Sequence, residues 1–242
     1  MRNLLKFSAI VAALAASATF ASADSLTLGS YGSTSGYTPP GTITVDNTQM
    51  NYAGYSLLST TPSTGTGTAF DLNPNPPVWV AASPNSAWVG ATTTAGPVGT
   101  VDLPIGYYTF STEFTAGSPG SPYSGSITVA ADDTTEVLLN GTVIVPFGTI
   151  GTDGHCAVGN PNCLMQDTID LSDITLLGGT DGNLLQFVVQ QAGTEGPGND
   201  PSGVDFVASL STAAPTPEPS TLLLLGTGLL GSAGALLRRK RA

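Results

Sequence analysis

Three carboxylates lie close together near the middle of the chain and could hold a metal ion. Asp132 and Asp133 are adjacent, Glu136 follows them, and a second acidic turn contains Asp181 and Asn183. Calcium takes about six to eight oxygen ligands, which loops of this kind supply. Neither group has the spacing of an EF-hand loop, and two aspartates before two threonines are also ordinary turn chemistry. We favour the turn and keep calcium bound by Asp132, Asp133 and Glu136 as the alternative.

Residue types that covalent catalysis needs are scarce. His155 is the only histidine, no lysine lies between Asp24 and Ala214, and no Gly-x-Ser-x-Gly turn is present. Without a base beside a nucleophile, a catalytic triad is not expected. Two carboxylates across a cleft could hydrolyse a glycosidic bond, but a chain with 17 acidic residues contains such pairs by chance. We therefore expect no enzyme activity and no cofactor other than the calcium considered above.

Cys156 and Cys163 are the only cysteines. The chain ends, considered below, indicate an oxidising compartment, where an even number of cysteines favours a disulfide. The bond would close a small loop around the turn-forming residues Gly159 to Asn162. The rival interpretation, a metal site with His155, lacks a fourth ligand. We expect a Cys156–Cys163 disulfide with His155 exposed in the loop.

Aromatic side chains could bind sugars by stacking on pyranose rings. The candidates are Trp79, Trp88, Tyr52, Tyr55 and Tyr123. Tyr123 lies between proline and serine in a glycine-rich segment, which favours a loop. It is therefore the candidate that we expect to be exposed.

The central part of the chain is acidic and has no fixed positive charge. All six Lys and Arg residues lie at the two ends, whereas every acidic residue except Glu218 lies between Asp24 and Ala214. A surface without cations cannot neutralise phosphates or release counterions. Nucleic acid is therefore excluded as a partner.

The segment between Asp24 and Ala214 has the pattern of an all-β domain. Short runs of Val, Ile, Thr, Tyr and Phe recur between clusters of Gly, Pro, Ser and Asn, and no helical periodicity is sustained. The predicted strands are Leu26 to Leu28, Thr42 to Asp46, Asn51 to Leu58, Val78 to Ala81, Ile105 to Phe114, Ser126 to Ala131, Glu136 to Asn140, Thr142 to Phe147, Leu184 to Gln191 and Val204 to Leu210.

Two local patterns indicate how these strands pair. Asn140 and Gly141 separate two aliphatic runs and form the preferred two-residue hairpin loop. Apolar and polar residues alternate in GYYTFSTEF and GVDFVASL, so that one face of each strand is buried and the other is wet. These patterns predict an antiparallel β-sandwich of jelly-roll type.

The N-terminus has the features of a cleaved signal peptide. Arg2 and Lys6 precede an apolar run, and Ala21 and Ala23 have the spacing that signal peptidase accepts. Because the apolar run is short for a membrane span, we expect cleavage after Ala23. Residues 1–23 then form the signal peptide, and the exported domain covers residues 24–214.

The C-terminus has the features of a membrane anchor. Leu222 to Leu237 is interrupted only by Gly, Thr, Ala and Ser, and a helix over this stretch covers roughly 24 Å, a little less than a hydrocarbon core. We expect a transmembrane helix at 222–237. The basic tail of Arg238, Arg239, Lys240 and Arg241 then stays on the cytoplasmic side and the acidic domain lies on the other.

Pro217, Glu218 and Pro219, the apolar stretch after them and the terminal basic cluster closely resemble the PEP-CTERM sorting signal of Gram-negative envelope proteins. The resemblance covers residues 215–242. It implies cleavage near the Pro-Glu-Pro sequence by an exosortase-type membrane protease. It also implies delivery to the cell surface or the extracellular polysaccharide matrix.

The segment from Tyr107 to Leu210 resembles the galactose-binding-like β-sandwich that is often found ahead of this signal. The stretches that carry the resemblance are YYTFSTEF, SGSITVAADDTTEVLLNGTVI, NLLQFVVQQAG and GVDFVASL. The resemblance implies that Trp88 packs near the first core strand. It also implies a fold whose members often hold a structural calcium near a sheet edge.

These features together predict a non-catalytic exported protein with an adhesive or scaffolding role in an exopolysaccharide or biofilm matrix. Its expected partners are the processing protease, extracellular polysaccharide and, before processing, the membrane. The alternative is a carbohydrate-binding module stabilised by calcium. An exposed aromatic row would favour the module, and a smooth polar surface would favour the scaffold.

Overall fold

A computed structural model describes residues 23–32, 51–56, 67–99, 103, 105–118, 120–150, 156–177, 182–192 and 200–213, together with 226, 228–229, 231–232, 236 and 238–239. The chain divides into two units. One is Asp24–Thr212, and the other combines Met1–Ala23 with Ala213–Ala242.

Strands make up the regular structure of the first unit. They are β1 (Ser25–Gly29), β2 (Asn51–Ser56), β3 (Gly67–Thr68), β4 (Phe70–Asp71), β5 (Val89–Gly90), β6 (Gly106–Phe114), β7 (Pro122–Asp132), β8 (Thr134–Leu139), β9 (Thr142–Val145), β10 (Asp167–Thr175), β11 (Asn183–Gln191) and β12 (Gly203–Thr212).

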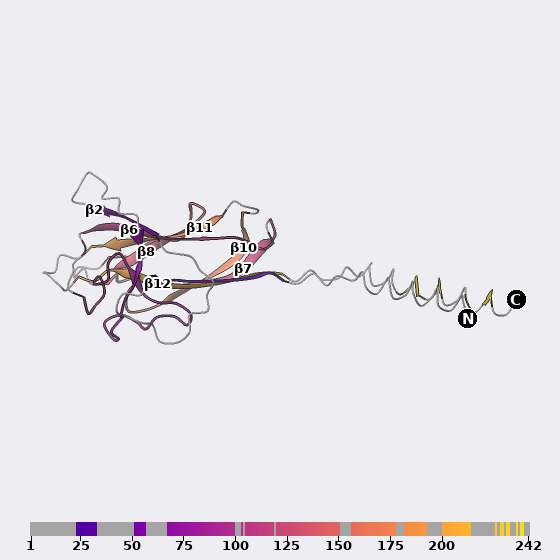
Figure 1. The fold of residues 1–242 in the computed structure, drawn as a ribbon, viewed down its shortest axis with the longest axis horizontal. Coiled ribbons are helices and arrows are strands. Elements are labelled where there is room, and N and C mark those ends of the chain that lie inside the picture. The colour runs from indigo at the N-terminus through magenta and orange to yellow at the C-terminus, as the bar shows by residue number, and fades with distance from the viewer. Residues whose placement is uncertain are drawn as a thin grey trace. The chain divides into compact units, whose positions relative to one another are not determined.

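The strands form two antiparallel sheets that pack as a sandwich (Figure 1). One sheet has the order β10-β7-β12-β5-β4, with β1 also paired to β12, and the other has the order β3-β2-β6-β11-β8-β9. β12 pairs with β7 along its whole length, from Gly203 opposite Asp132 to Thr212 opposite Tyr123. The predicted all-β antiparallel sandwich is confirmed.

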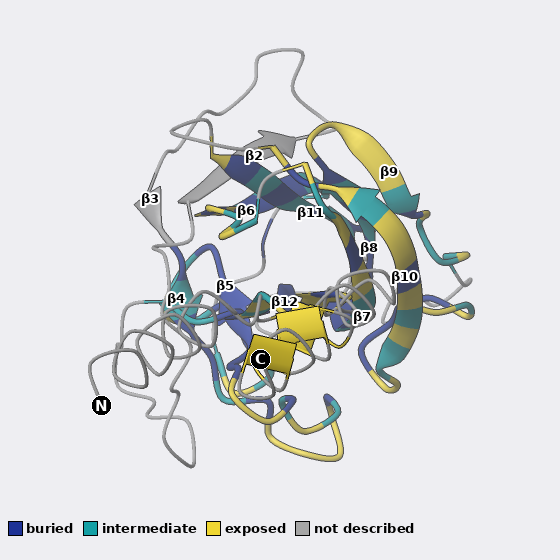
Figure 2. Ribbon diagram, turned by 90° about the vertical axis from the view of Figure 1, so that its right-hand side faces the viewer, coloured by how far each residue is buried: buried dark blue, intermediate teal, exposed yellow. Residues whose placement is uncertain are grey.

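Alternating apolar residues fill the space between the sheets. In β11 every second residue from Asn183 to Gln191 is buried, and the central part of β12 follows the same pattern. Phe187 of β11 stacks on Phe206 of β12, with ring centroids 4.1 Å apart. Figure 2 shows the buried residues along the inner strands and the greater exposure of β9 and β10 at the sheet edges.

The hairpin predicted at Asn140 and Gly141 is confirmed. Both residues have positive φ angles, 50° and 78°, as a two-residue hairpin loop requires. They join β8 to β9, with Leu139 opposite Thr142. The loop thus sets the pairing of these two strands.

One predicted strand is not a strand in the structure, the strands β3, β4, β5 and β10 were not predicted, and one prediction falls outside the described residues. Val78 to Ala81 is not a strand, because residues 75–78 form a turn in which Val78 N–H donates to the Asn75 carbonyl at 3.1 Å. Neighbouring prolines lack the N–H groups that a sheet needs. β10 was not expected, since aspartates interrupt its apolar pattern; it is an edge strand with most residues exposed or half-buried. Thr42 to Asp46 lies outside the described residues.

The segment 72–88 covers the face of β12 that points away from the other sheet. Trp79 and Trp88 are fully buried there and stack with ring centroids 4.2 Å apart. A Cβ on Gly203 would meet the Val89 carbonyl oxygen at 2.8 Å and the Trp79 ring at 3.0 Å. Glycine at position 203 therefore lets the Trp79 ring lie against the start of β12.

The described residues of the C-terminal segment, including Gly226 and Arg238, are helical. Among the residues that the structure describes, no helix is long and apolar enough to cross a membrane. The span predicted at 222–237 lies mostly outside these residues and stays a prediction. Residues 1–22 of the predicted signal peptide, including Ala21, also lie outside them.

Candidate metal centre

Asp132 and Asp133 lie where the chain passes from one sheet to the other. Asp132 is the last residue of β7 and Asp133 is the single residue before β8. The peptide bond between them is cis. Their side chains are 2% and 0% exposed, so both carboxyl groups are removed from bulk water.

A third aspartate, Asp200, joins them from the segment before β12. It is 5% exposed, and its charge acts on Asp132. Burial raises the pKa of Asp132 well above its ordinary value, and the charges of Asp133 and Asp200 raise it further. A hydrogen bond from Trp79 Nε1 to Asp132 Oδ2, 2.5 Å long, acts in the opposite direction. Burial is therefore the main reason that the pKa of Asp132 is raised.

The backbone on both sides of Gln191 is bonded to Asp133. Asp133 N–H donates to the Gln190 carbonyl at 3.1 Å, and Ala192 N–H donates to Asp133 Oδ2 at 2.6 Å. The Gln191 side chain is fully buried, and neither amide atom has a hydrogen-bond partner among the described residues. A buried amide without a partner is costly, and its oxygen is a ligand type that calcium uses.

Asp205 shows how this domain buries a carboxyl group without a cation. It is fully buried, and its Oδ1 accepts from Ser86 Oγ at 2.6 Å and from Ser30 Oγ at 3.3 Å. Its Oδ2 accepts from Ser83 N–H at 2.8 Å. Asp205 is thus solvated by neutral donors, whereas the pKa of Asp132 is raised by two neighbouring negative charges.

The three aspartates do not form a compact set of metal ligands. Among the described residues, the ligand atoms that lie within 4.8 Å of one another belong to Asp132, Cys156 and Cys163, not to Asp132, Asp133 and Asp200. Carboxylate oxygens are ligands that calcium prefers, and the chain has no lysine or arginine between Asp24 and Ala214. A calcium ion beside Asp132 and Asp133 would favour the ionised form of their carboxyl groups.

Glu136 does not join this group. It lies within β8, opposite Val188, and it is not among the charges that raise the pKa of Asp132.

The second acidic turn is used for structure. Asn183 Oδ1 accepts hydrogen bonds from Asn140 Nδ2 at 3.0 Å and from Leu177 N–H at 2.7 Å. These two donors satisfy the oxygen that a metal ion would need. Asp181 lies outside the described residues.

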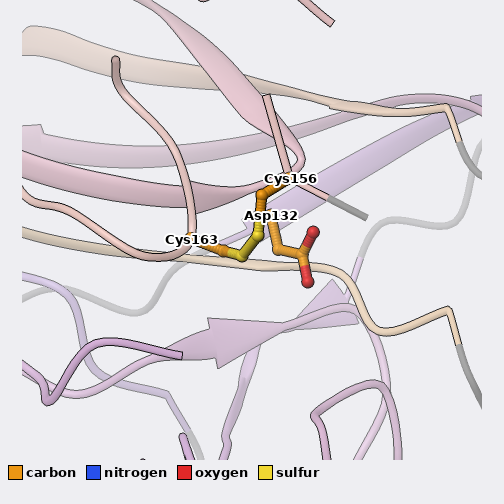
Figure 3. Close-up of side chains that lie close together, drawn as sticks. All are labelled: Asp132, Cys156 and Cys163. Carbon is orange, nitrogen blue, oxygen red and sulfur yellow. A yellow bond between two sulfur atoms is a disulfide. The ribbon is translucent and has the colours of Figure 1, made fainter. Parts of the chain in front are cut away.

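The disulfide predicted between Cys156 and Cys163 is confirmed, with Cα atoms 5.6 Å apart. The two sulfur atoms and a carboxylate oxygen of Asp132 lie within 4.8 Å of one another. Figure 3 shows the Asp132 side chain alongside the bond. Because the sulfur atoms are bonded to each other, they do not serve as thiolate ligands. His155 lies outside the described residues.

The expectation that Tyr123 is exposed is wrong. Its side chain is fully buried in β7, where its hydroxyl donates to the Asp24 carboxylate and accepts from Ser118 N–H at 3.0 Å. The glycine-rich surroundings suggested a loop, but the tyrosine lies on the inner face of a strand. Trp88 is buried as expected, and the side chains of Tyr52 and Tyr55 lie outside the description.

Sequence reasoning missed Asp200, Gln191 and the hydrogen bond from Trp79. Asp200 comes directly before Pro201 and the alternating pattern of β12. Nothing in the sequence places Gln191 or Trp79 beside the aspartates, because both are distant from them along the chain.

Comparison with known proteins concerns mainly the C-terminal segment. Residues 215–241 match the family model described as the PEP-CTERM protein-sorting motif. This chain carries a PEP-CTERM sorting motif. The motif includes Pro217, Glu218 and Pro219 and extends to Arg241. It implies export, processing by an exosortase at the membrane and delivery to the cell surface.

The solved structures similar to this chain are parts of larger proteins. A β-glucosidase from Kluyveromyces marxianus in complex with glucose is 14% identical, with a TM-score of 0.34, and covers 72% of this chain and 16% of its own. A Podospora anserina GH26-CBM35 β-(1,4)-mannanase is 15% identical, with a TM-score of 0.32, and covers 81% and 29%.

A GH31 α-xylosidase from Xanthomonas citri is 8% identical, with a TM-score of 0.29, and covers 69% of this chain and 15% of its own. This chain thus spans less than a third of each of these structures. No curated protein matches it. The strand pairing, not these likenesses, establishes the β-sandwich.

Proposed function

We propose that this chain is a non-catalytic exported protein that serves adhesion or scaffolding at the cell surface or in the extracellular matrix. We further propose that its sandwich binds calcium at the adjacent aspartates Asp132 and Asp133. The sorting motif at 215–241 supports the proposed location at the cell surface or in the matrix. The acidic, lysine-free and arginine-free segment from Asp24 to Ala214 supports a matrix role, because such a surface stays soluble and can be bridged by divalent cations.

One observation carries the calcium proposal: two adjacent carboxyl groups, those of Asp132 and Asp133, are buried in a segment of the sequence that has no lysine or arginine. Asp132, Asp133 and Asp200 are each at most 5% exposed. Without calcium, burial and mutual repulsion favour protonation, at a cost in free energy near neutral pH. Calcium removes this cost by supplying the missing positive charge.

The position of the three aspartates explains what calcium does for the fold. Asp132 ends β7 and Asp200 precedes β12, which both belong to one sheet, while Asp133 precedes β8 of the other sheet. An ion held by Asp132 and Asp133 ties the two sheets together at this end of the sandwich. Such a tie suits a protein that bears load in a matrix.

Sugar recognition by aromatic stacking is not part of the proposal. Trp79, Trp88 and Tyr123 are fully buried, and among the described residues the large exposed hydrophobic side chains are all aliphatic. A row of exposed aromatic rings, which would favour a carbohydrate-binding module, is therefore not present in the described part of the domain. Polysaccharide contact through acidic groups and divalent ions remains within the proposed scaffold role.

Thermal unfolding tests the calcium part. At a calcium concentration about 100 times the dissociation constant, the stabilisation is about 2.7 kcal/mol, which raises the Tm by roughly 5 to 10 °C for a domain of this size. The double variant Asp132→Asn/Asp133→Asn should lose this shift. Asp170→Asn, an exposed change of the same chemistry on β10, should keep it. An equal Tm with calcium and with chelator rejects calcium binding.

Cell fractionation tests the proposed cellular location and the proposed adhesive role. A strain that lacks the gene receives the wild-type chain, the double variant or Asp170→Asn, and each protein is measured in the cytosolic, surface and matrix fractions. The wild type and Asp170→Asn should reach the surface or matrix and restore cell retention in it, and the double variant should restore less. Unchanged retention in the deletion strain rejects the adhesive role.

A further inference from the structure

The hairpin loop between β8 and β9 contains the only Asn-Gly sequence in the chain, Asn140-Gly141. In such a sequence the backbone nitrogen of the glycine can attack the asparagine side chain, because glycine has no Cβ that hinders the approach. Both residues are exposed, so water and hydroxide reach them. The loop therefore places a self-reactive sequence on the surface of the domain.

The folded domain holds the Asn140 side chain by both ends of its amide. Oδ1 accepts from Leu184 N–H at 2.8 Å, and Nδ2 donates to Asn183 Oδ1 at 3.0 Å. The Asn140 backbone N–H also donates to the Leu184 carbonyl at 2.9 Å. These bonds tie the amide to β11, whereas attack by the Gly141 nitrogen would tie its carbon to the loop. The side chain must therefore leave β11 before it reacts.

The orientation of the Asn183 amide decides what position 140 has to supply. Asn183 is fully buried. Its Oδ1 accepts from Leu177 N–H at 2.7 Å, and its Nδ2 donates to the Leu177 carbonyl at 3.1 Å. Because a backbone N–H only donates and a carbonyl only accepts, this amide cannot turn over without losing both bonds. Asn183 thus presents an oxygen toward position 140, where a donor is required.

We propose that Asn140 is a site of spontaneous deamidation that the folded hairpin suppresses. Hydroxide removes the proton from the Gly141 nitrogen, which then attacks Cγ of Asn140, and the side-chain nitrogen leaves as ammonia. Water opens the resulting succinimide at either carbonyl and gives aspartate or isoaspartate. The net reaction consumes water and releases ammonia, and it needs neither an oxidant nor an enzyme.

Both products weaken the hairpin. An ionised aspartate has no N–H, so at position 140 a carboxylate oxygen faces Asn183 Oδ1. Isoaspartate lengthens the backbone of the loop by a methylene, which a two-residue hairpin loop with positive φ angles of 50° and 78° does not accommodate. β9 pairs only with β8 at the edge of its sheet (Figure 2). Deamidation therefore loosens this edge irreversibly.

The fold controls the rate, because the side chain reacts only while the hairpin is open. Local opening of an edge element occurs without unfolding of the whole domain. A reaction of the open form proceeds in proportion to the fraction of molecules that are open. Deamidation at Asn140 thus marks the chains in which β8 and β9 have separated from the Asn183 side chain.

The test follows deamidation of the full chain in mildly alkaline buffer by peptide mapping and mass spectrometry. We expect Asn140 in the folded wild type to react roughly tenfold or more slowly than in denaturant. Asn183→Ala, which removes the acceptor, should react faster than wild type when folded. Thr142→Ala, an exposed change in the same hairpin, should react as wild type does. Gly141→Ala should react slowly even in denaturant.

Equal rates in folded and denatured wild type overturn the suppression by the fold. A denatured wild type that does not react at Asn140 overturns the site itself. Equal rates in folded Asn183→Ala and Thr142→Ala overturn the role of Asn183. If Asn183→Ala does not fold, the melting temperature of Asn140→Asp, which has the product side chain, is compared with that of wild type. A lower value supports the inference, and an equal value overturns it.

Discussion

Asp24 and Thr212 are the first and last residues of the sandwich domain in the sequence. Two reciprocal hydrogen bonds join them. Asp24 N–H donates to Thr212 Oγ1 and Thr212 N–H donates to the Asp24 carbonyl, both at 2.9 Å. The buried hydroxyl of Tyr123 adds a hydrogen bond to the Asp24 carboxylate. The first residue expected in the mature protein is therefore joined to the last residue of β12, shortly before the sorting motif.

Removing the Tyr123 hydroxyl should weaken the attachment of Asp24 to the end of β12. Tyr123→Phe keeps the buried ring but deletes the bonds to Asp24 and Ser118. We expect a loss of about 1 to 3 kcal/mol in the free energy of unfolding, measured by denaturant titration. Ser211→Ala, at an exposed neighbouring position of β12, should stay within about 0.5 kcal/mol of wild type. A Tyr123→Phe variant as stable as that control contradicts the prediction.

The tryptophans should report calcium binding. The chain has two, and only the Trp79 indole donates to the candidate site, since the Trp88 indole donates to the Val80 carbonyl at 2.9 Å. Ionisation of Asp132 on calcium binding should change the fluorescence of Trp79. Trp88→Phe should keep the calcium-dependent change and Trp79→Phe should lose it. A signal that survives in Trp79→Phe and not in Trp88→Phe contradicts this assignment.

Asp205 should make the domain less stable as the pH rises. Burial raises its pKa above the ordinary 3.8, although bonds from Ser86, Ser83 and Ser30 lower it. Between the unfolded and folded pKa values the native state holds more protons than the unfolded state, so stability falls with rising pH. The contribution of Asp205 to the free energy of unfolding is present in full below about pH 4. It is lost as the pH rises through the pKa that Asp205 has in the folded state.

The variant Asp205→Asn isolates this effect from general charge repulsion. Unfolding free energies are measured across the acidic range for wild type and variant in the presence of chelator. The difference between the two should change with pH in the direction given above. Parallel curves for the two proteins would show that Asp205 does not titrate differently on folding.

Gly141→Ala should destabilise the domain through backbone conformation alone. Gly141 has a φ angle of 78°, and a Cβ there would meet no atom within 4 Å. An L-residue in this region costs about 1 to 2 kcal/mol. Thr142→Ala, at the exposed start of β9, should cost less. Thermal unfolding of both variants checks the prediction, which fails if Gly141→Ala melts with the wild type.

The sequence predicted the elements that are determined by residues close to one another along the chain. Asn140-Gly141 and the alternation in β11 and β12 depend on neighbouring residues only, so the hairpin and the sandwich followed from them. β10 could not be found in this way, because an edge strand with Asp167, Asp170 and Asp173 lacks an apolar face. Val78 to Ala81 has strand-like residues but lies in a proline-rich turn.

The candidate site was predicted in part for the same reason. Asp132 and Asp133 are adjacent in the sequence, so their pairing was visible. Asp200 and Trp79 come close to them only through the pairing of β7 with β12 and the packing of segment 72–88. Tyr123 was misplaced because its hydroxyl is satisfied by Asp24, which lies 99 residues away along the chain.

Isothermal titration of calcium into the chelator-treated chain from Asp24 onward tests the central claim most directly. The account predicts one calcium ion per chain, with binding abolished in Asp132→Asn/Asp133→Asn, retained in Asp170→Asn and weaker at acidic pH, where protons compete for the carboxylates. Absence of binding by the wild type near neutral pH, or equal binding by the double variant, would contradict it.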